Sequence, residues 1–162
     1  MTRQPIPENL QADLIEGVLL SELKQISDAR GAVLHMLRCD DAAFIKFGEC
    51  YFSEVLPGEI KAWKCHREQT QNLAVPVGRM RFVIYDQREF SLTRGNLQIL
   101  ELGRPDSYLR LTIPPGLWYG FTCISSSASL VVNFTDLPHH PSESQVREIN
   151  HPLIPYEWQS VK

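Results

Sequence analysis

Residues 58–78 read GEIKAWKCHREQTQNLAVPVG, and the spacing of glycines and polar residues in this stretch decides the fold. Five residues separate Gly58 from Lys64, and His66 follows Lys64 after one further residue. Four residues then lead to Gln71, and six more lead to Gly78. The glycines predict turns, because glycine adopts backbone conformations that other residues avoid. We expect the polar residues between the two glycines to lie on strands of a barrel.

This spacing matches the first motif of metal-binding cupin barrels, in which a glycine precedes His-x-His, then a glutamate, then a second glycine. A second cupin motif places a ligand histidine three residues after the glycine of a Pro-x-Gly turn. Here PPGLWYGF (114–121) puts Tyr119 at that position. The four converging positions are therefore Lys64, His66, Gln71 and Tyr119.

Only one of these four positions suits a divalent metal. His66 is a good ligand, whereas a protonated lysine repels a cation and an amide binds transition metals weakly. We therefore expect no metal and no cofactor. Purely structural roles remain open: a core His66 bonded to Gln71 or Tyr119, a solvated Lys64 at the barrel mouth, and a core Tyr119 with a paired hydroxyl.

The composition is that of one ordinary globular domain spanning residues 1–162. A net charge of −3 argues against a nucleic-acid partner. The first residues show no signal-peptide pattern, and no apolar run reaches the roughly 18 residues of a membrane span. Cys39, Cys50, Cys65 and Cys123 form no CxxC pair, which predicts buried, reduced thiols and a cytoplasmic location.

Short β-rich runs separated by Gly and Pro turns predict an all-β fold, a cupin-type double-stranded β-helix or jelly roll. The clearest runs are GVLLSELKQI (17–26), GAVLHMLR (31–38), ECYFSEVL (49–56), MRFVIYD (80–86), LQILEL (97–102), YLRLTI (108–113) and SLVVNF (129–134). The run RMRFVIYD (79–86) alternates, which places Met80, Phe82 and Ile84 on one face of a half-buried sheet.

Helix is expected only in short pieces. PENLQADLIEG (7–17) predicts a short amino-terminal helix, and DDAAFIKF (40–47) a second, with Asp40 or Asp41 as its cap. The Pro-rich tail (137–158) is predicted to pack over the barrel as irregular chain, anchored by Tyr156 and Trp158.

Four motifs occur together and in order: SDARG (27–31), PGEIKAW (57–63), IPPGLWYGF (113–121) and PLIPYEW (152–158). With them the chain, over residues 17–158, resembles the dTDP-4-dehydrorhamnose 3,5-epimerase family. The members of that family are metal-independent cupins that act on nucleotide-linked 4-keto-6-deoxy sugars. The resemblance implies a nucleotide-sugar ligand and a homodimer in which the partner completes the active site.

The resemblance carries the substrate contacts over unevenly. Arg30 matches an arginine that contacts the nucleotide in the family. Lys61 stands where an arginine holds the pyrophosphate, so the charge is kept but bidentate recognition is lost. Glu49 and Tyr51 stand where a substrate-facing glutamine and asparagine are expected. Gln71 stands where the epimerases carry a lysine that stabilises the enolate oxygen.

The catalytic set differs more. Lys64 occupies the position of the family's catalytic histidine, the general base, and Tyr119 replaces the histidine of its AHGF motif. The family's catalytic tyrosine follows a TTD or ATN motif, whereas here Leu137 and Pro138 follow Asp136.

The resemblance implies an isomerase or epimerase of a nucleotide-linked 4-keto-6-deoxy sugar, with a substituted catalytic set. Epimerisation beside a ketone needs a base, an acid and a group that holds the enolate charge. Lys64 could be the base if burial and neighbouring cations lowered its pKa, with His66 or Tyr119 as the acid. Strict alternation, however, points Lys61 and Arg67 away from Lys64.

A second reading remains open: a non-catalytic cupin that binds a sugar or nucleotide sugar. The family's base, acid and lysine positions are all substituted, which favours this reading. A metal-dependent cupin oxygenase is disfavoured by the missing ligands.

Overall fold

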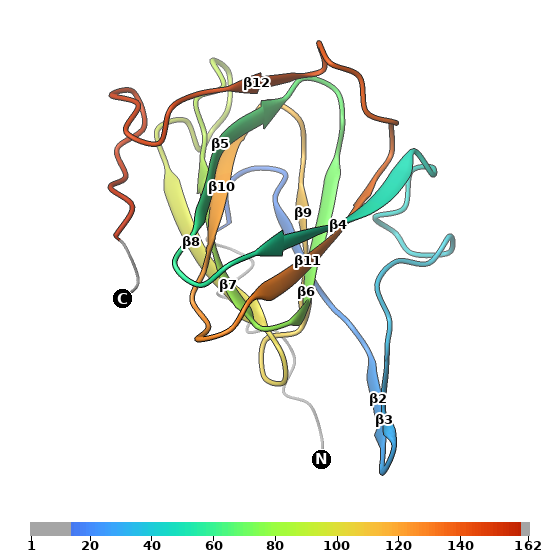
Figure 1. The fold of residues 1–162 in the computed structure, drawn as a ribbon. Helices are drawn as coiled ribbons and strands as arrows, with labels where there is room; N and C mark the ends of the chain where they lie inside the picture. Colours follow the sequence, from blue (N-terminus) through green and yellow to red (C-terminus); the bar gives the residue numbers. More distant parts are fainter. Residues whose placement is uncertain (1–13, 160–162) are drawn as a thin grey trace.

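The computed structural model describes residues 14–159, in which two five-stranded antiparallel sheets pack face to face (Figure 1). The strands are β1 (Leu19–Glu22), β2 (Gln25–Asp28), β3 (Gly31–Leu34), β4 (Glu49–Val55), β5 (Ile60–His66), β6 (Gln71–Val77), β7 (Arg79–Tyr85), β8 (Leu97–Gly103), β9 (Leu109–Ile113), β10 (Trp118–Cys123), β11 (Ser129–Thr135) and β12 (Ser144–Val146). One sheet has the order β1-β9-β6-β11-β4 and the other β12-β5-β10-β7-β8, while β2 and β3 form a separate hairpin. Successive strands β5, β6 and β7 alternate between the sheets, which confirms the predicted jelly roll.

The glycines that bound the 58–78 stretch form the turns that the sequence predicts. Gly58 and Gly78 have φ values of 74° and 77°, in the left-handed region that favours glycine. A Cβ at Gly78 would also lie 2.1 Å from the hydroxyl oxygen of Ser129. No other residue fits there, so the β6–β7 turn, and with it the start of β7, is fixed locally.

Strand β7 is buried on its inner face and partly buried on its outer face. Met80, Phe82 and Ile84 are fully buried between the sheets, as their alternation predicts. Val83 faces the other way but is also fully buried, because it packs with Trp63 under the carboxy-terminal segment. The predicted half-buried strand is confirmed at the exposed Arg79 and the half-buried Arg81 and Tyr85, and is wrong only at Val83.

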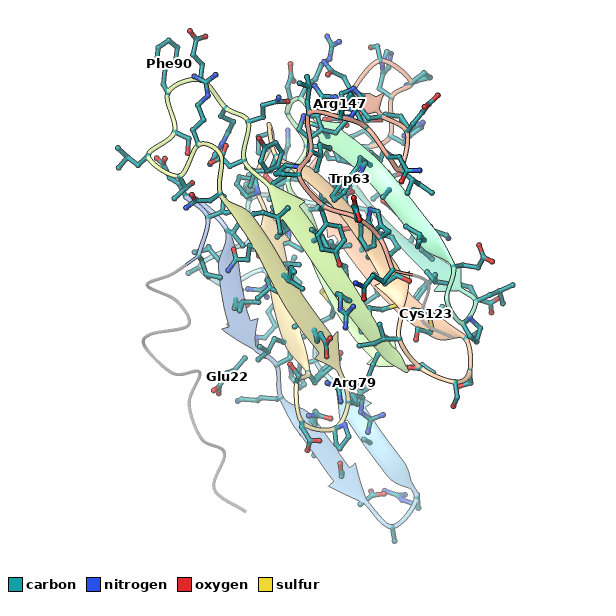
Figure 2. The ribbon with its side chains drawn as sticks, turned by 90° about the vertical axis from the view of Figure 1, so that its left-hand side faces the viewer. Glu22, Trp63, Arg79, Phe90, Cys123 and Arg147 are labelled. Atoms are coloured by element: carbon teal, nitrogen blue, oxygen red, sulfur yellow. The ribbon has the colours of Figure 1, made fainter. Side chains whose placement is uncertain are left out.

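The carboxy-terminal segment covers the outer face of the sheet that contains β5 (Figure 2). Strand β12, which the sequence did not predict, pairs with β5 and places Val146 opposite Lys64. Beyond it, the rings of Tyr156 and Trp158 lie 6.2 and 5.1 Å from the ring of Trp63. The predicted anchoring of the tail by these two aromatic residues is confirmed.

The helix predicted over residues 40–47 is wrong, because this segment forms turns. The Asp41 carboxylate accepts a hydrogen bond from the Ala43 N–H at 3.1 Å and pairs with the buried Arg110 guanidinium at 2.7 and 2.9 Å. The carboxylate that would cap a helix is thus committed to a buried cation on β9. The helix predicted over residues 7–17 lies mostly outside the described residues, and residues 14–17 form a bend and a turn.

All four cysteines are unpaired. Cys123 is buried and Cys65 is half-buried, whereas Cys39 and Cys50 are exposed. The prediction of buried thiols is therefore wrong for two of them, because Cys50 lies on the edge strand β4 and Cys39 in the segment that precedes it. Across residues 14–159, no helix is long and apolar enough to cross a membrane.

Candidate active site

A cavity of about 370 Å³ lies between the two sheets, a volume within the usual range of small-molecule sites. Its polar wall is formed by Tyr51, Ser53, Lys61, Lys64, Tyr119 and Asn133. Leu73, Phe121 and Val131 contribute apolar surface. The cavity is therefore lined from both sheets, by β4, β6 and β11 on one side and by β5, β10 and β12 on the other.

Both lysines face this cavity because β5 contains a bulge. Along the β5–β10 ladder, Tyr119 pairs with Lys64 and Phe121 with Lys61, so the single residue between the pairs on β10 lies opposite two residues on β5. An extra residue reverses the alternation of side chains beyond it. The expectation that Lys61 points away from Lys64 is therefore wrong. Arg67 follows the end of β5, is exposed and lies outside the cavity wall.

The cavity wall carries positive charge without a compensating acid. The Lys61 ammonium donates to the Ser53 hydroxyl at 2.7 Å and to the Glu54 carbonyl at 2.8 Å, which holds it toward β4. Lys64 is half-buried and forms no ion pair within residues 14–159. Because no carboxylate of residues 14–159 lines the cavity, both ammonium groups are available to an anionic ligand.

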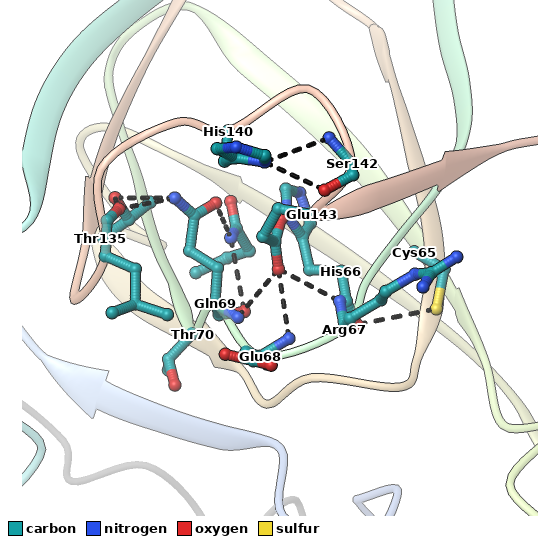
Figure 3. Close-up of polar contacts among 12 residues, drawn as sticks. Cys65, His66, Arg67, Glu68, Gln69, Thr70, Thr135, His140, Ser142 and Glu143 are labelled. Atoms are coloured by element: carbon teal, nitrogen blue, oxygen red, sulfur yellow. Dashed lines mark hydrogen bonds and ion pairs between the residues drawn. The ribbon is translucent and has the colours of Figure 1, made fainter.

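Behind the cavity, the Glu143 carboxylate is enclosed by hydrogen-bond donors (Figure 3). One oxygen accepts the backbone N–H groups of Arg67, Glu68 and Gln69 at 3.0, 3.1 and 2.9 Å. The other oxygen contacts Nδ1 of His66. Burial raises the pKa of Glu143, but these donors outweigh it and hold the pKa below its usual value. Glu143 is thus a carboxylate anion.

His66 connects this carboxylate to the cavity. Its Nε2 lies 3.2 Å from the hydroxyl of Tyr119, and the side chains of both residues are buried. Burial lowers the pKa of His66, and the hydrogen bond and negative charge of Glu143 offset this only in part. Burial also raises the pKa of Tyr119 well above its usual value, with Tyr51 and Glu143 adding to the effect. At neutral pH the resting pair is a neutral imidazole and a neutral phenol.

A chain of amides runs beside this pair and ends at the cavity. Gln69 Nε2 donates to the Leu137 carbonyl at 2.6 Å, and Gln71 Nε2 donates to Gln69 Oε1 at 2.8 Å. Asn133 Nδ2 in turn donates to Gln71 Oε1 at 2.7 Å and to the Tyr51 hydroxyl at 2.8 Å. A carbonyl can only accept, so Leu137 fixes the direction of every amide in the chain.

The structure brings most of the predicted site residues together. Tyr51, Lys61, Lys64 and Tyr119 line the cavity, and the buried His66 and Gln71 contact Tyr119 from behind. The contact between His66 and Tyr119 is also what a purely structural role of His66 predicts. The catalytic and binding roles of these residues stay predictions.

Two further predicted site residues, Glu49 and Arg30, also lie outside the cavity wall. Glu49 is the first residue of β4 and is half-buried. Arg30 lies in the turn of the β2–β3 hairpin, with a side chain that is 91% exposed and paired with Asp28 at 2.7 Å. Within one chain, Arg30 takes no part in the cavity.

Asn133 and Glu143 are among the site residues that were not predicted. Asn133 gives a signal in retrospect, because it is a lone amide in the apolar run SLVVNF and is buried. Glu143 gives none: it lies in a Pro-rich tail, 77 residues from His66 in the sequence. Only the pairing of β12 with β5 brings it close.

The residues at the cupin metal positions do not fit a metal. In residues 14–159 no group of three or more His, Cys, Asp or Glu side chains is placed to hold an ion. Both ring nitrogens of His66 have protein partners, Glu143 and Tyr119. The neighbouring positions offer only the Lys64 ammonium and the Gln71 amide, whose oxygen already accepts from Asn133.

Two packed sheets around a cavity with these positions define a cupin-type jelly roll. Residues 13–162 match the family model of dTDP-4-dehydrorhamnose 3,5-epimerase, and the chain belongs to this family. The resemblance found in the sequence is thereby confirmed.

Three relatives are similar over nearly their whole length. A solved dTDP sugar isomerase from Desulfovibrio desulfuricans G20 is 50% identical, with a TM-score of 0.88 over 91% of this chain and 96% of its own. The spore coat polysaccharide biosynthesis protein SpsL of Bacillus subtilis is 29% identical over 90% of this chain and 97% of its own. The probable low-salt glycan biosynthesis epimerase Agl13 of Haloferax volcanii is 32% identical over 88% of this chain and 89% of its own.

Proposed function

We propose that this protein is an isomerase or epimerase of a nucleotide-linked 4-keto-6-deoxy sugar. The observation that supports this most is the cavity, in which two lysines and no carboxylate face the ligand space of an epimerase-family barrel. Two ammonium groups in a partly dry pocket attract the charges of a pyrophosphate. The Desulfovibrio relative is a dTDP sugar isomerase, which agrees with a dTDP-linked ligand.

Binding is assigned to residues on both sheets. We assign the pyrophosphate contact to Lys61, whose ammonium is held toward β4. Tyr51 lines the same cavity. Gln71 accepts a hydrogen bond from the wall residue Asn133, and Glu49 lies at the start of β4; we assign both to substrate binding as well. Arg30 would contact the nucleotide of a partner subunit, since it lies far from its own cavity.

Catalysis is assigned to Lys64, His66 and Tyr119. Removal of a proton beside the ketone leaves negative charge on the keto oxygen, and a cation close to that oxygen stabilises it. Lys64 lies opposite Tyr119 on the neighbouring strand, so we assign Lys64 the role of this cation and leave the role of the base to another group. Lys64 thereby replaces the lysine that the family carries at the position of Gln71.

Calorimetry with dTDP and a dTDP-4-keto-6-deoxyhexose tests the binding role. Lys61→Gln should weaken binding of both ligands by roughly 10- to 100-fold, because it removes a charge-assisted contact. The matched control Lys46→Gln changes an exposed lysine outside the cavity wall and should bind as wild type does. Equal affinity for Lys61→Gln and wild type would contradict the cavity as the ligand site.

The alternative, a non-catalytic cupin that binds the same ligand, is favoured by the substituted catalytic positions. Solvent deuterium exchange at C3 and C5 of the keto sugar, followed by mass spectrometry, separates the two. An epimerase exchanges these protons faster than buffer does. Tight binding with exchange at the buffer rate would establish the binding protein instead.

The assembly and location are also part of the proposal. We propose a homodimer, supported by the exposed β2–β3 hairpin that carries Arg30 away from its own barrel (Figure 1). Four unpaired cysteines support a reducing compartment, the cytoplasm.

A further inference from the structure

The direction of each hydrogen bond around His66 is fixed by its neighbours. The Glu143 carboxylate has no proton to give, and one of its oxygens is already saturated by three backbone N–H groups. The contact between its other oxygen and Nδ1 of His66 therefore requires the proton to lie on Nδ1. A neutral imidazole with a proton on Nδ1 presents a lone pair at Nε2.

The hydroxyl of Tyr119 meets that lone pair. Its nearest partners within residues 14–159 are Nε2 of His66 at 3.2 Å and Oε1 of Gln71 at 3.5 Å. Both are acceptors, since the amide chain from Leu137 fixes Oε1 of Gln71 in that role. Tyr119 therefore donates its proton to these acceptors behind the cavity, and its oxygen receives no hydrogen bond from a described residue. Because Tyr119 lines the cavity, a ligand there can contact its side chain, whose oxygen keeps a lone pair to accept a proton.

We propose, on the basis of the proposed function, that Tyr119 is the general base and that Glu143, acting through His66, is its positioning residue. The C–H bond beside the ketone breaks, and its proton forms a new O–H bond on Tyr119. The former phenol proton moves to Nε2 of His66. The electron pair of the C–H bond forms the enolate, whose oxygen contacts the Lys64 ammonium, and Glu143 balances the imidazolium. Solvent water then protonates the carbon from the other face, and the His66 imidazolium and Tyr119 return the extra proton to the hydroxide that this leaves, which completes inversion.

The charges around His66 agree with this sequence of events. Glu143 favours the imidazolium, whereas burial, Lys64 and His139 disfavour it, so His66 is neutral until a proton arrives. Burial likewise keeps Tyr119 protonated at rest. Neither a phenolate nor an imidazolium has to exist before the substrate binds.

Nuclear magnetic resonance tests the tautomer without any substrate. Long-range ¹H–¹⁵N spectra of wild type should show His66 protonated on Nδ1. In Glu143→Gln the three backbone N–H groups hold the amide oxygen, so the amide NH₂ faces Nδ1 and the proton should move to Nε2. Glu148→Gln, an exposed glutamate in the same tail, should leave the spectrum unchanged. Wild type protonated on Nε2 would overturn the proposal.

Deuterium exchange at C3 and C5 tests the catalytic part. General base catalysis contributes about 10²- to 10⁴-fold, so Tyr119→Phe and Glu143→Gln should each lower the exchange rate by such a factor. Calorimetric binding of dTDP should stay within about threefold of wild type, which shows that the variants fold and keep the cavity. Exchange that survives in either variant would overturn the relay. Wild type that binds but does not exchange would refute the proposed enzyme, while the spectra still decide the tautomer.

Discussion

Lys64 and Tyr119 are opposite one another on neighbouring strands, and both face the cavity. Side chains at directly opposite positions on one face of a sheet begin only about 5 Å apart at their Cβ atoms. A ketone and its adjacent C–H group could therefore contact an ammonium and a phenol at once. For this reason we assign the cation to Lys64 and the base to Tyr119, instead of assigning both roles to Lys64.

Lys64→Gln tests the assigned cation. The variant keeps a polar side chain of similar length but removes the charge, so the exchange rate at C3 and C5 should fall by about 10²- to 10³-fold. Affinity for dTDP itself should change less than it does in Lys61→Gln. Exchange is measured by mass spectrometry on saturating keto sugar, with Lys46→Gln as the control. A rate within a few-fold of wild type would remove Lys64 from the reaction.

The site could be predicted from the sequence only where its residues lie on regular strands. Motif spacing located Lys64, His66, Gln71 and Tyr119, because glycine turns and alternating strands translate spacing into position. Lys61 was placed on the wrong face, since a bulge leaves no mark in the spacing. Glu143 could not be found, because its position depends on a tail that pairs with a strand 77 residues earlier.

At the scale of elements, the β7–β8 loop is a second feature whose internal structure could not be predicted from the sequence. Its sequence, DQREFSLTRGN (86–96), is polar enough to predict only a turn. The structure shows a fully buried Asp86 that binds Arg88 at 2.8 Å and accepts the hydroxyls of Ser91 and Thr93. Burial alone would raise the pKa of Asp86, but these donors outweigh it and hold the pKa far below its usual range. One carboxylate thus organises the loop, whose tip exposes Phe90 (Figure 2).

Asp86→Asn should lower the free energy of unfolding at pH 7 by about 3 kcal/mol, because it leaves Arg88 without its partner. The sign of the pH effect follows from the lowered pKa. The contribution of Asp86 is complete above the unfolded-state pKa of about 3.9 and is lost as pH falls below it. The difference between variant and wild type should therefore shrink between pH 5 and pH 2.

Urea unfolding followed by tryptophan fluorescence at several pH values measures this difference. Asp106→Asn is the matched control, since Asp106 is exposed and lies outside the network. A destabilisation that stays constant from pH 7 to pH 2 would show that the charge of Asp86 is not its source.

At the scale of the molecule, the two sheets account for every strand of residues 14–159 except those of the β2–β3 hairpin. It forms a two-stranded sheet of its own and projects from the barrel (Figure 1). Ile26 and Val33 are opposite one another in it and are 57% and 62% exposed. An isolated hairpin is marginally stable in water, and an apolar pair on its surface favours burial against another chain.

We therefore expect a dimer in which the hairpin contacts a second copy. Light scattering after size exclusion should report twice the chain mass of 18.5 kDa across micromolar concentrations. Ile26→Lys puts a charge into the contact and should shift the protein toward monomer. Leu92→Lys, at an exposed loop position, should leave the mass unchanged.

If the hairpin also delivers Arg30 to the partner's cavity, Arg30→Gln should weaken dTDP binding while the dimer persists. A wild-type monomer would exclude that role, because Arg30 does not reach its own cavity.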